Sequence, residues 1–274
     1  RRRVMKSITL CSDDFGENDA ICHGILELVK NSRLQAVTVF SEAPGWQTQG
    51  PALLEYSQQI DIGIHLNLTQ DFNQQAPLFG LGELLIKSHL RLIDKSSIKD
   101  SFRRQIDAFT KLSGRLPNFL DGHQHVHAFP VISTALCEVI AEYWPSNKNL
   151  YVRDSSKVDM RADGFLTKKL ILRAACSSLD PQLENLKVPS PKYFAGVYDF
   201  NPSAKMAHLF DQWLSLSQDG SLFMCHPAAH GSADALGPAR ANEFDYLNSS
   251  AFINACERYG VTLDTYTNYL AKHP

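Results

Sequence analysis

The sequence has no long apolar segment. None of its apolar runs approaches the roughly 20 residues that a helix needs to cross a bilayer. The amino terminus also lacks the apolar stretch of a secretory signal. We therefore predict a chain without a membrane span and with a cytoplasmic location.

Positive charge is not in excess either. The 27 Lys and Arg residues stand against 29 Asp and Glu residues, which gives a formal net charge of −2. Nucleic-acid binding usually requires a positive field, so we expect no nucleic-acid partner. The basic cluster Arg1-Arg2-Arg3 lies directly before a strand-like run. We expect residues 1–6 to be a cloning remnant or a disordered terminus without function.

The cysteines lack the spacing of a metal or disulfide framework. None stands in a CxxC or zinc-finger pattern, and several lie inside apolar runs. Such thiols pack as small apolar side chains. We expect all six to be reduced and structural: Cys11, Cys22, Cys137, Cys176, Cys225 and Cys256.

Enough apolar material is present for one large core. Hydrophobic residues make up 44% of the 274 residues and charged residues 20%, which is ordinary for a globular protein. No linker divides the chain, so we predict a single domain over residues 7–274. Two polar stretches, residues 70–82 and 180–191, are expected to be long surface loops.

Apolar strands and amphipathic helices alternate along the chain. This alternation predicts a parallel sheet, either open or closed into a barrel. Strands are predicted at residues 7–11, 36–40, 60–66, 118–120, 150–153, 193–195, 221–225 and 261–263. Helices are predicted after Asn18 and near residues 51–59, 98–112, 130–143, 166–177 and 204–216.

Polar residues follow several of these strands. Barrel enzymes assemble their sites from the loops at the carboxyl ends of the strands, whereas an open sheet gathers loops mainly at one switch point. The distribution therefore favours an α/β fold closed into a barrel. The residues concerned are Asp13, Asp14, His65, the histidines within residues 123–127, and His226.

An acidic pair ends the first strand. Asp13 and Asp14 stand shortly before Gly16, so one carboxylate could bind a metal ion while the other faces a bound water. The pair could instead cap the following helix, because Asp favours such positions. Asp14-Phe15-Gly16 also matches a protein-kinase triplet, but the glycine-rich loop, lysine strand and catalytic loop of a kinase are missing. We exclude a kinase.

Histidines supply further candidate ligands. His65 lies inside an apolar strand, where a single histidine is more often a core residue. It is accompanied by Asp121-Gly122-His123-Gln124-His125-Val126-His127, in which the acid could orient a ring. This density of histidine and carboxylate is typical of a zinc or related divalent site. Because three neighbouring rings seldom reach one ion, we expect one or two of them to contact substrate or to support the ligands.

His226 ends another apolar strand and precedes Pro227. Beside a metal site it is a candidate general acid, since histidine can carry a proton near neutral pH. His230 could be a second such group. The remaining histidines are expected on helices or the tail at the surface: His23, His89, His208 and His273.

At these residues the chain resembles the YdjC-like carbohydrate deacetylases, which include the chitooligosaccharide deacetylase ChbG and hopanoid-associated relatives. The resemblance extends from Ile8 to about Tyr269 and rests on four motifs in the same order. Cys11-Ser12 and Ala228 depart from the residues usual in the family, Asn-Ala and glycine. The motifs are Asp13-Asp14-Phe15-Gly16, Gly63-Ile64-His65-Leu66-Asn67-Leu68-Thr69, residues 120–130, and Met224-Cys225-His226-Pro227.

The resemblance implies an irregular (β/α) TIM-like barrel of the glycoside hydrolase and deacetylase type. It implies one divalent ion, Mg²⁺ or Zn²⁺, bound by Asp14, His65 and His123. Asp13 would be the catalytic base and a protonated His226 the acid. The implied reaction removes N-acetyl groups from acetylated amino sugars or oligosaccharides, and relatives raise the expectation of a homodimer. Substrate contacts are expected from His125, His127, Arg153, Phe194 and Tyr198.

Two other functions remain open from the residues. A metal-dependent amidohydrolase would use a His-x-His pair, either His123/His125 or His125/His127, although that pair usually opens the first strand. A non-catalytic sugar-binding protein would need aromatic stacking surfaces. The candidates for these are Trp46, Tyr193, Phe194, Tyr198 and Trp213.

Overall fold

The computed structural model describes residues 5–75, 77–146 and 149–273. The prediction made for residues 1–6 falls mostly outside these ranges, and Lys6 is the first residue of β1. Among the described residues, no helix is both long enough and apolar enough to cross a membrane. All six cysteines are buried and free, as predicted.

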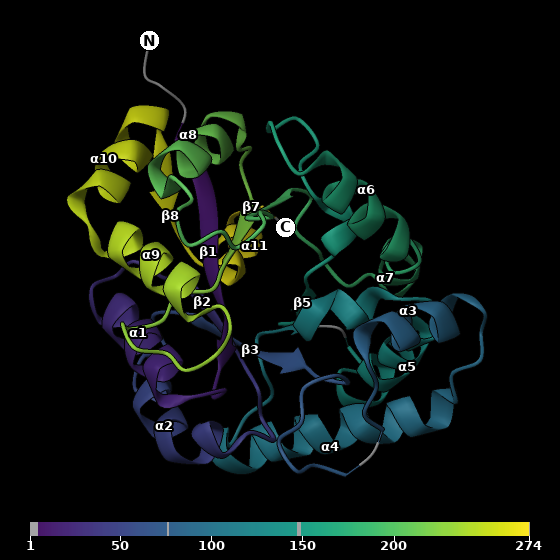
Figure 1. Cartoon of the computed structure of the whole chain (residues 1–274). Coiled ribbons are helices and arrows are strands. Elements are labelled where there is room, and N and C mark those ends of the chain that lie inside the picture. Colours follow the sequence, from purple (N-terminus) through teal and green to yellow (C-terminus); the bar gives the residue numbers. More distant parts are fainter. Residues whose placement is uncertain (1–4, 76, 147–148, 274) are drawn as a thin grey trace.

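A parallel sheet of eight strands forms the centre of the domain (Figure 1). Seven strands follow the order β5-β4-β3-β2-β1-β7-β6, and β8 pairs with β1. All seven ladders are parallel, as the alternation of strands and helices predicts. The strands are β1 Lys6–Phe15, β2 Ala36–Val39, β3 Asp61–Leu66, β4 Phe119–Gly122, β5 Tyr151–Val152, β6 Phe194–Ala195, β7 Ser221–Cys225 and β8 Val261–Leu263.

Helices surround the sheet (Figure 1). Capping residues set the ends of some of them. The Asn18 side chain accepts the Ile21 N–H at the start of α1, and Gly114 ends α4 with a φ of +69°. The α-helices are α1 Asp19–Lys30, α2 Pro44–Leu54, α3 Leu81–His89, α4 Lys95–Ser113, α5 Ile132–Tyr143, α6 Leu166–Ala175, α7 Asp180–Leu186, α8 Met206–Leu216, α9 Gly237–Asn248, α10 Ser250–Tyr259 and α11 Tyr266–Lys272. The 3₁₀ helices are η1 His123–Ala128 and η2 Ser155–Lys157.

The sheet is curled, but it does not close into a complete barrel. No ladder joins β5 to β6 within the described part of the chain, where one bridge between Val158 and Phe194 stands near the gap. The two edge strands have two residues each, and the chain between them forms η2, α6 and α7. The α/β class is therefore confirmed, and the closed TIM-like barrel is replaced by a curled, partly open sheet.

Side chains from both edges of the sheet meet on its concave face. One cluster joins Phe119 and Tyr151 of β4 and β5 with Phe194 and Leu222 of β6 and β7. Phe119 and Tyr151 are stacked, with ring centroids 4.9 Å apart. A packed interior of this kind fixes the curvature and brings the carboxyl ends of distant strands together.

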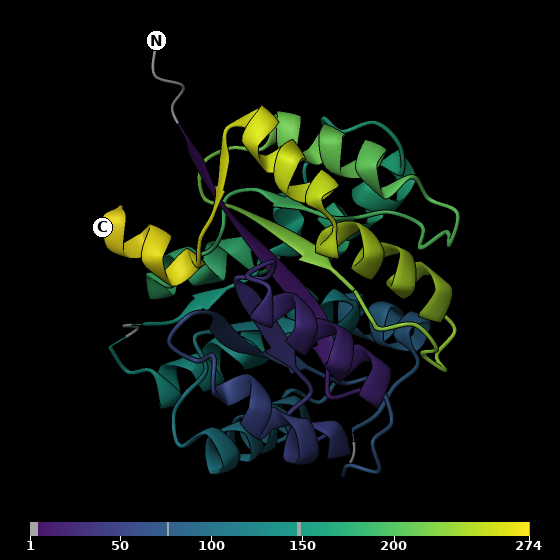
Figure 2. The same cartoon turned by 90° about the vertical axis from the view of Figure 1, so that its left-hand side faces the viewer.

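The opposite end of the sheet is covered by α11. The Thr267 N–H donates to Asp61 Oδ2 at the start of β3, and Tyr266 packs against Tyr151 of β5. α11 lies toward the amino end of β1 (Figure 2). The carboxyl ends of the strands are thus left as the accessible side of the sheet.

Candidate metal centre and active site

The carboxyl ends of the strands surround a cavity of about 380 Å³. β1 contributes Asp13 and Asp14, β3 contributes His65, and the segments after β4 and β7 contribute His123 and His226. The structure thereby brings together all five residues that the sequence motifs associate with metal binding and catalysis.

An irregularity at the end of β1 turns two adjacent carboxylates into this cavity. In a regular strand, successive side chains point to opposite faces. Here the pairing with β2 shifts between Ser12 and Phe15, and Asp14 has a φ of +67°, which non-glycine residues rarely adopt. Asp13 and Asp14 consequently line the same cavity. Backbone strain of this kind collects at functional sites.

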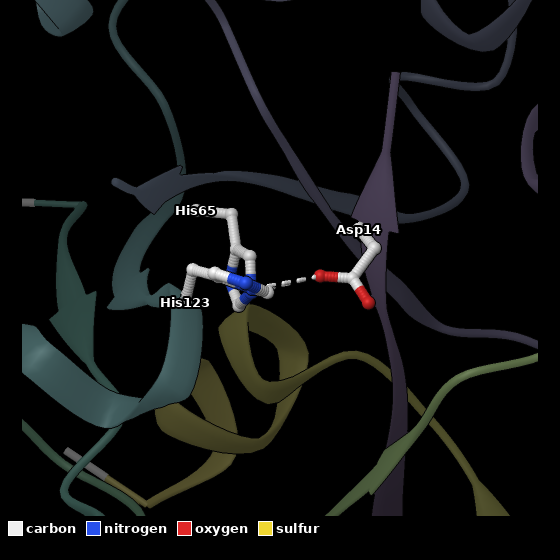
Figure 3. A group of neighbouring side chains, drawn as sticks. All are labelled: Asp14, His65 and His123. Atoms are coloured by element: carbon white, nitrogen blue, oxygen red, sulfur yellow. Dashed lines mark hydrogen bonds and ion pairs between the residues drawn. The ribbon is translucent and has the colours of Figure 1, made fainter. Parts of the chain in front are cut away.

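Asp14, His65 and His123 form a compact group in which both rings face the carboxylate (Figure 3). Asp14 Oδ1 lies 3.3 Å from His65 Nε2 and 3.2 Å from His123 Nδ1. One donor atom from each residue lies within 4.8 Å of the other two. Two imidazole nitrogens and a carboxylate oxygen form a donor set that suits a divalent ion such as zinc. The residues present therefore fit the implied ion.

Asp121 orients His65 from the side opposite Asp14. Its Oδ1 lies 2.7 Å from His65 Nδ1 and accepts the Thr38 hydroxyl at 2.7 Å. Burial lowers the pKa of His65, but Asp121 and Asp13, with a hydrogen bond to Asp14, raise it to about 10. A positive charge is thus favoured between these carboxylates, and a bound divalent ion would supply one. A carboxylate behind a histidine is also the usual support of a metal ligand.

Arg153 fills the centre of a second acidic group, which consists of Cys11, Asp13 and Asp121. Its Nη2 lies 2.6 Å from Asp13 Oδ1, 2.8 Å from Asp121 Oδ2 and 3.1 Å from Cys11 Sγ. Because the guanidinium already supplies the positive charge, we do not assign a metal ion to this group.

Asp13 is held by both ends of the same guanidinium. Arg153 Nη1 donates to Oδ2 at 2.8 Å, and Nη2 donates to Oδ1. Burial raises the pKa of Asp13, but Arg153 outweighs burial and lowers it to about 2. Asp13 is therefore a carboxylate with a fixed orientation at neutral pH.

His226 lies beside Asp13 in the cavity wall. Its Nε2 is 3.6 Å from Asp13 Oδ2, and its backbone N–H donates to Glu243 Oε2 at 2.7 Å. Burial lowers the pKa of His226 to about 4, although Asp13 and Asp14 oppose this change. Burial thus favours the neutral ring at neutral pH, and the role of His226 as the acid stays a prediction.

Two charged residues of α9 belong to the site, although no sequence motif contains them. Arg240 donates to Asp14 Oδ2 at 2.8 Å and lines the cavity. Glu243 accepts the Tyr198 hydroxyl at 2.5 Å as well as the N–H of His226. The signal in the sequence is slight, since a basic and an acidic residue three positions apart are common on exposed helices.

The histidine-rich segment forms η1 instead of continuing a strand. Gln124 and His125 have φ values of +53° and +61°, so the alternate histidines do not share one face. His125 lines the cavity, and its Nδ1 lies 2.8 Å from Ser155 Oγ. His127 is completely buried, with Nε2 2.6 Å from the Arg153 carbonyl oxygen. Of these two expected substrate contacts, only His125 reaches the cavity.

Three other expected substrate contacts lie behind the cavity wall. Arg153, Phe194 and Tyr198 are each at most 2% exposed and do not line the cavity. Ion pairing explains the position of Arg153, and core packing explains that of Phe194. Tyr198 is held by Glu243. These placements correct the prediction that the three side chains touch the substrate.

The aromatic residues considered as sugar-stacking surfaces are mostly core residues. Trp46 is fully buried and stacks on Phe109, while Trp213 packs against Phe210. Tyr193 is half-buried and does not line the cavity. His230 is exposed, pairs with Asp245 and lies outside the cavity lining, so it is not a second acid of this site. The surface positions predicted for four histidines are confirmed: His23, His89, His208 and His273.

The curled parallel sheet with helices around it defines the class as an α/β domain. A family 4 acetyl xylan esterase of Clostridium thermocellum, solved in complex with a cobalt ion, has the same fold with a TM-score of 0.52 and 12% identity, over 97% of this chain and 91% of that one. A crystal structure from Enterococcus faecalis V583 gives a TM-score of 0.67 and 21% identity, over 96% and 98% of the two chains.

The sequence model of the YdjC-like protein family matches residues 7–258, and the chain belongs to this family. The human carbohydrate deacetylase is 27% identical over 153 residues, which are 51% of this chain and 46% of the human protein. The Serratia marcescens chitooligosaccharide deacetylase is 27% identical over 139 residues, which are 46% of this chain and 53% of that protein. The chain thus spans about half the length of the curated relatives it matches.

Proposed function

We propose that this protein is a metal-dependent hydrolase that removes N-acetyl groups from acetylated amino sugars or oligosaccharides. One divalent ion, Mg²⁺ or Zn²⁺, would be held by Asp14, His65 and His123. The observation that carries the proposal is the convergence of this group with Asp13 and His226 on one cavity. The carbohydrate deacetylases among its relatives support the choice of reaction.

A divalent ion bound there would polarise a water and the acetyl carbonyl and would stabilise negative charge on oxygen. The donor set supports this role, because Asp14 turns Oδ1 toward both rings while Arg240 binds Oδ2. Asp121 fixes the orientation of the His65 ring. The residues around the ligands thus hold them in place before substrate arrives.

Asp13 is proposed as the general base that takes the proton of the attacking water. Its orientation is fixed by Arg153, and it remains a carboxylate at neutral pH. It stands next to Asp14 in sequence and lines the same cavity, so it faces the reacting atoms without being one of the three proposed ligands.

His226 is proposed as the group that returns a proton to the leaving amine. Because burial keeps its ring neutral at rest, it must first take up a proton during turnover. Asp13 is the neighbouring carboxyl group, with Oδ2 3.6 Å from His226 Nε2, and can pass on the proton that it has accepted. An amide needs a protonated leaving nitrogen, whereas an ester depends on it less, so His226 should matter most for N-acetyl substrates.

The rival amidohydrolase assignment with a His-x-His pair receives less support. His127 is buried beneath the cavity, and His125 is bonded to Ser155. Neither belongs to the Asp14, His65 and His123 group. A purely sugar-binding protein would need no base, so a charged Asp13 in the cavity lining supports the catalytic proposal over this alternative.

The proposal is tested by acetate release from a panel of N-acetylated sugars, with Mg²⁺, Zn²⁺ or a chelator. We expect release with one of the two ions and its loss after chelation. Sugar binding without acetate release under every condition would favour the sugar-binding alternative. Two ions per active chain would favour the amidohydrolase.

A further inference from the structure

The cavity at the candidate metal centre has two chemically different parts. The strand ends supply the charged part described above. The rest comes largely from apolar side chains of two helices, α3 and α6. Leu81 and Leu85 belong to α3, and Ile171, Leu172 and Ala175 belong to α6.

The helical part of the cavity has few free hydrogen-bonding groups. Each of its polar side chains has one partner in the protein: Lys168 donates to the Tyr198 carbonyl oxygen at 2.6 Å, and Gln124 accepts the Thr69 hydroxyl at 2.8 Å. His125 is likewise bonded to Ser155. A sugar ring placed against the apolar side chains of α3 and α6 would bury hydroxyl groups against carbon atoms, which is costly. An apolar group meets no such cost.

The apolar surface continues from the cavity to the outside of both helices. Leu81 and Ile171 line the cavity while remaining 39% and 57% exposed. Ile86, Leu166 and Leu170 of the same helices are also exposed, at 61%, 58% and 52%, but they do not line the cavity. Large apolar side chains that are exposed at the mouth of a ligand cavity, as Leu81 and Ile171 are, mark a binding surface.

We propose that the substrate is an amphipathic glycoside, in which an N-acetylated sugar carries an alkyl or acyl chain that lies between α3 and α6. This inference rests on the proposed function for the sugar end of the ligand. The charged part of the cavity receives the acetamido group, and the chain covers Ile171 and Leu81. Continuity between the two parts within one cavity selects this occupant over a separate partner.

Binding of two soluble probes tests the apolar part directly. Octyl and methyl N-acetyl-β-D-glucosaminide share the sugar and differ only in the chain, and calorimetry below the micelle concentration compares them as monomers. Each pair of buried methylene groups is worth roughly a tenfold gain in affinity, so we expect the octyl glycoside to bind about 100-fold more tightly or better. Equal affinity for the two probes would overturn the proposal.

A matched pair of variants locates the chain. Ile171→Asp changes a residue that lines the cavity, whereas Leu170→Asp changes its neighbour, which is similarly exposed but does not line the cavity. We expect Ile171→Asp to lower the octyl affinity by about tenfold or more and Leu170→Asp to change it by less than about twofold. Circular dichroism verifies that both variants fold. Equal losses in the two variants would indicate adsorption to the surface and would contradict the proposed site.

Acetate release from the same probes separates this inference from the proposed function. Tight, Ile171-dependent binding of the octyl glycoside without any acetate release would retain the apolar site and reject the deacetylase. Acetate release from both glycosides, with equal affinity and equal kcat/KM, would support the deacetylase function and contradict the apolar site. A higher kcat/KM for the octyl glycoside supports both.

Discussion

Two arginines hold the adjacent carboxylates of the site from different directions. Arg153 binds both oxygens of Asp13, and Arg240 binds only Oδ2 of Asp14. Asp14 Oδ1 is therefore the oxygen that faces His65 and His123. This difference between neighbouring, chemically identical residues supports Asp14 as the ligand and Asp13 as the base.

The substitution Asp13→Asn separates the two roles. It removes the basic carboxylate but leaves Asp14, His65 and His123 unchanged, so bound metal should be retained. Because general base catalysis is worth typically 10²–10⁴-fold, kcat should fall by about that factor. Elemental analysis and acetate release measure the two effects. A metal-loaded Asp13→Asn variant with wild-type turnover would show that Asp13 is not the base.

Glu243 makes the stability of the protein depend on pH, and it contacts the segment that carries His226. Its two oxygens accept the Tyr198 hydroxyl and the His226 backbone N–H. Burial raises its pKa from 4.5 to about 7, although both hydrogen bonds and Arg240 lower it and Asp13 adds to the rise. Between these two pH values the unfolded chain releases this proton while the folded protein keeps it, so the contribution to stability falls as pH rises.

Comparison with Glu243→Gln isolates this contribution. From pH 4.5 to 7 the wild-type free energy of unfolding should fall by about 3 kcal/mol relative to that of the variant, because the variant has no titrating group at position 243. Urea denaturation across this range measures the difference. Parallel stability curves for the two proteins would mean that burial does not perturb Glu243.

At the scale of elements, periodicity predicted the strands well and the local irregularities not at all. Residues 221–225 and 261–263 form β7 and β8 as predicted. The helices α3 and α7 were missed and lie in or next to predicted loops, because helices of nine and seven residues carry little amphipathic pattern. No helix was predicted after residue 216 either, where α9, α10 and α11 form. α2 also begins earlier than predicted, at Pro44.

The candidate site was predictable as a set of residues but not as a geometry. His65 and His226 could be found because an ionisable ring ends an apolar strand. The bulge at Asp14 and the positive φ angles in η1 could not, because they depend on tertiary packing and not on local propensity. For the same reason Arg153 was assigned to substrate, although it lies buried among carboxylates.

Close packing between α1 and the segment after β7 makes Gly24 sensitive to substitution. A Cβ atom at Gly24 would lie 2.4 Å from Ala229 N and 2.7 Å from Ala228 C. Gly24→Ala should therefore displace the segment next to His226, lower stability by about 1–3 kcal/mol and reduce kcat. Urea unfolding and acetate release measure both effects.

The matched control is Gly82→Ala in α3, where no atom lies within 4 Å of the added Cβ. It should be neutral or stabilise by up to about 1 kcal/mol, because alanine favours a helix more than glycine does. If Gly24→Ala proves as stable as Gly82→Ala and as active as wild type, the packing of α1 does not position His226.

Across the whole molecule, the site exists only because the sheet curls. Asp14, His65 and His123 belong to or follow β1, β3 and β4, and His226 follows β7 on the other side of β1. The apolar interior between the sheet edges holds these strand ends around one cavity, while α11 covers the opposite end. The homodimer suggested by relatives stays a prediction, which light scattering in solution tests.

Metal content of purified variants tests the central claim most directly. We predict one divalent ion per wild-type chain and nearly none in His65→Ala or His123→Ala. His208→Ala is the matched control, because His208 is an exposed residue of α8 outside the cavity and should leave the metal content unchanged. Full metal content in both His65→Ala and His123→Ala would contradict the assignment of Asp14, His65 and His123 as the metal centre.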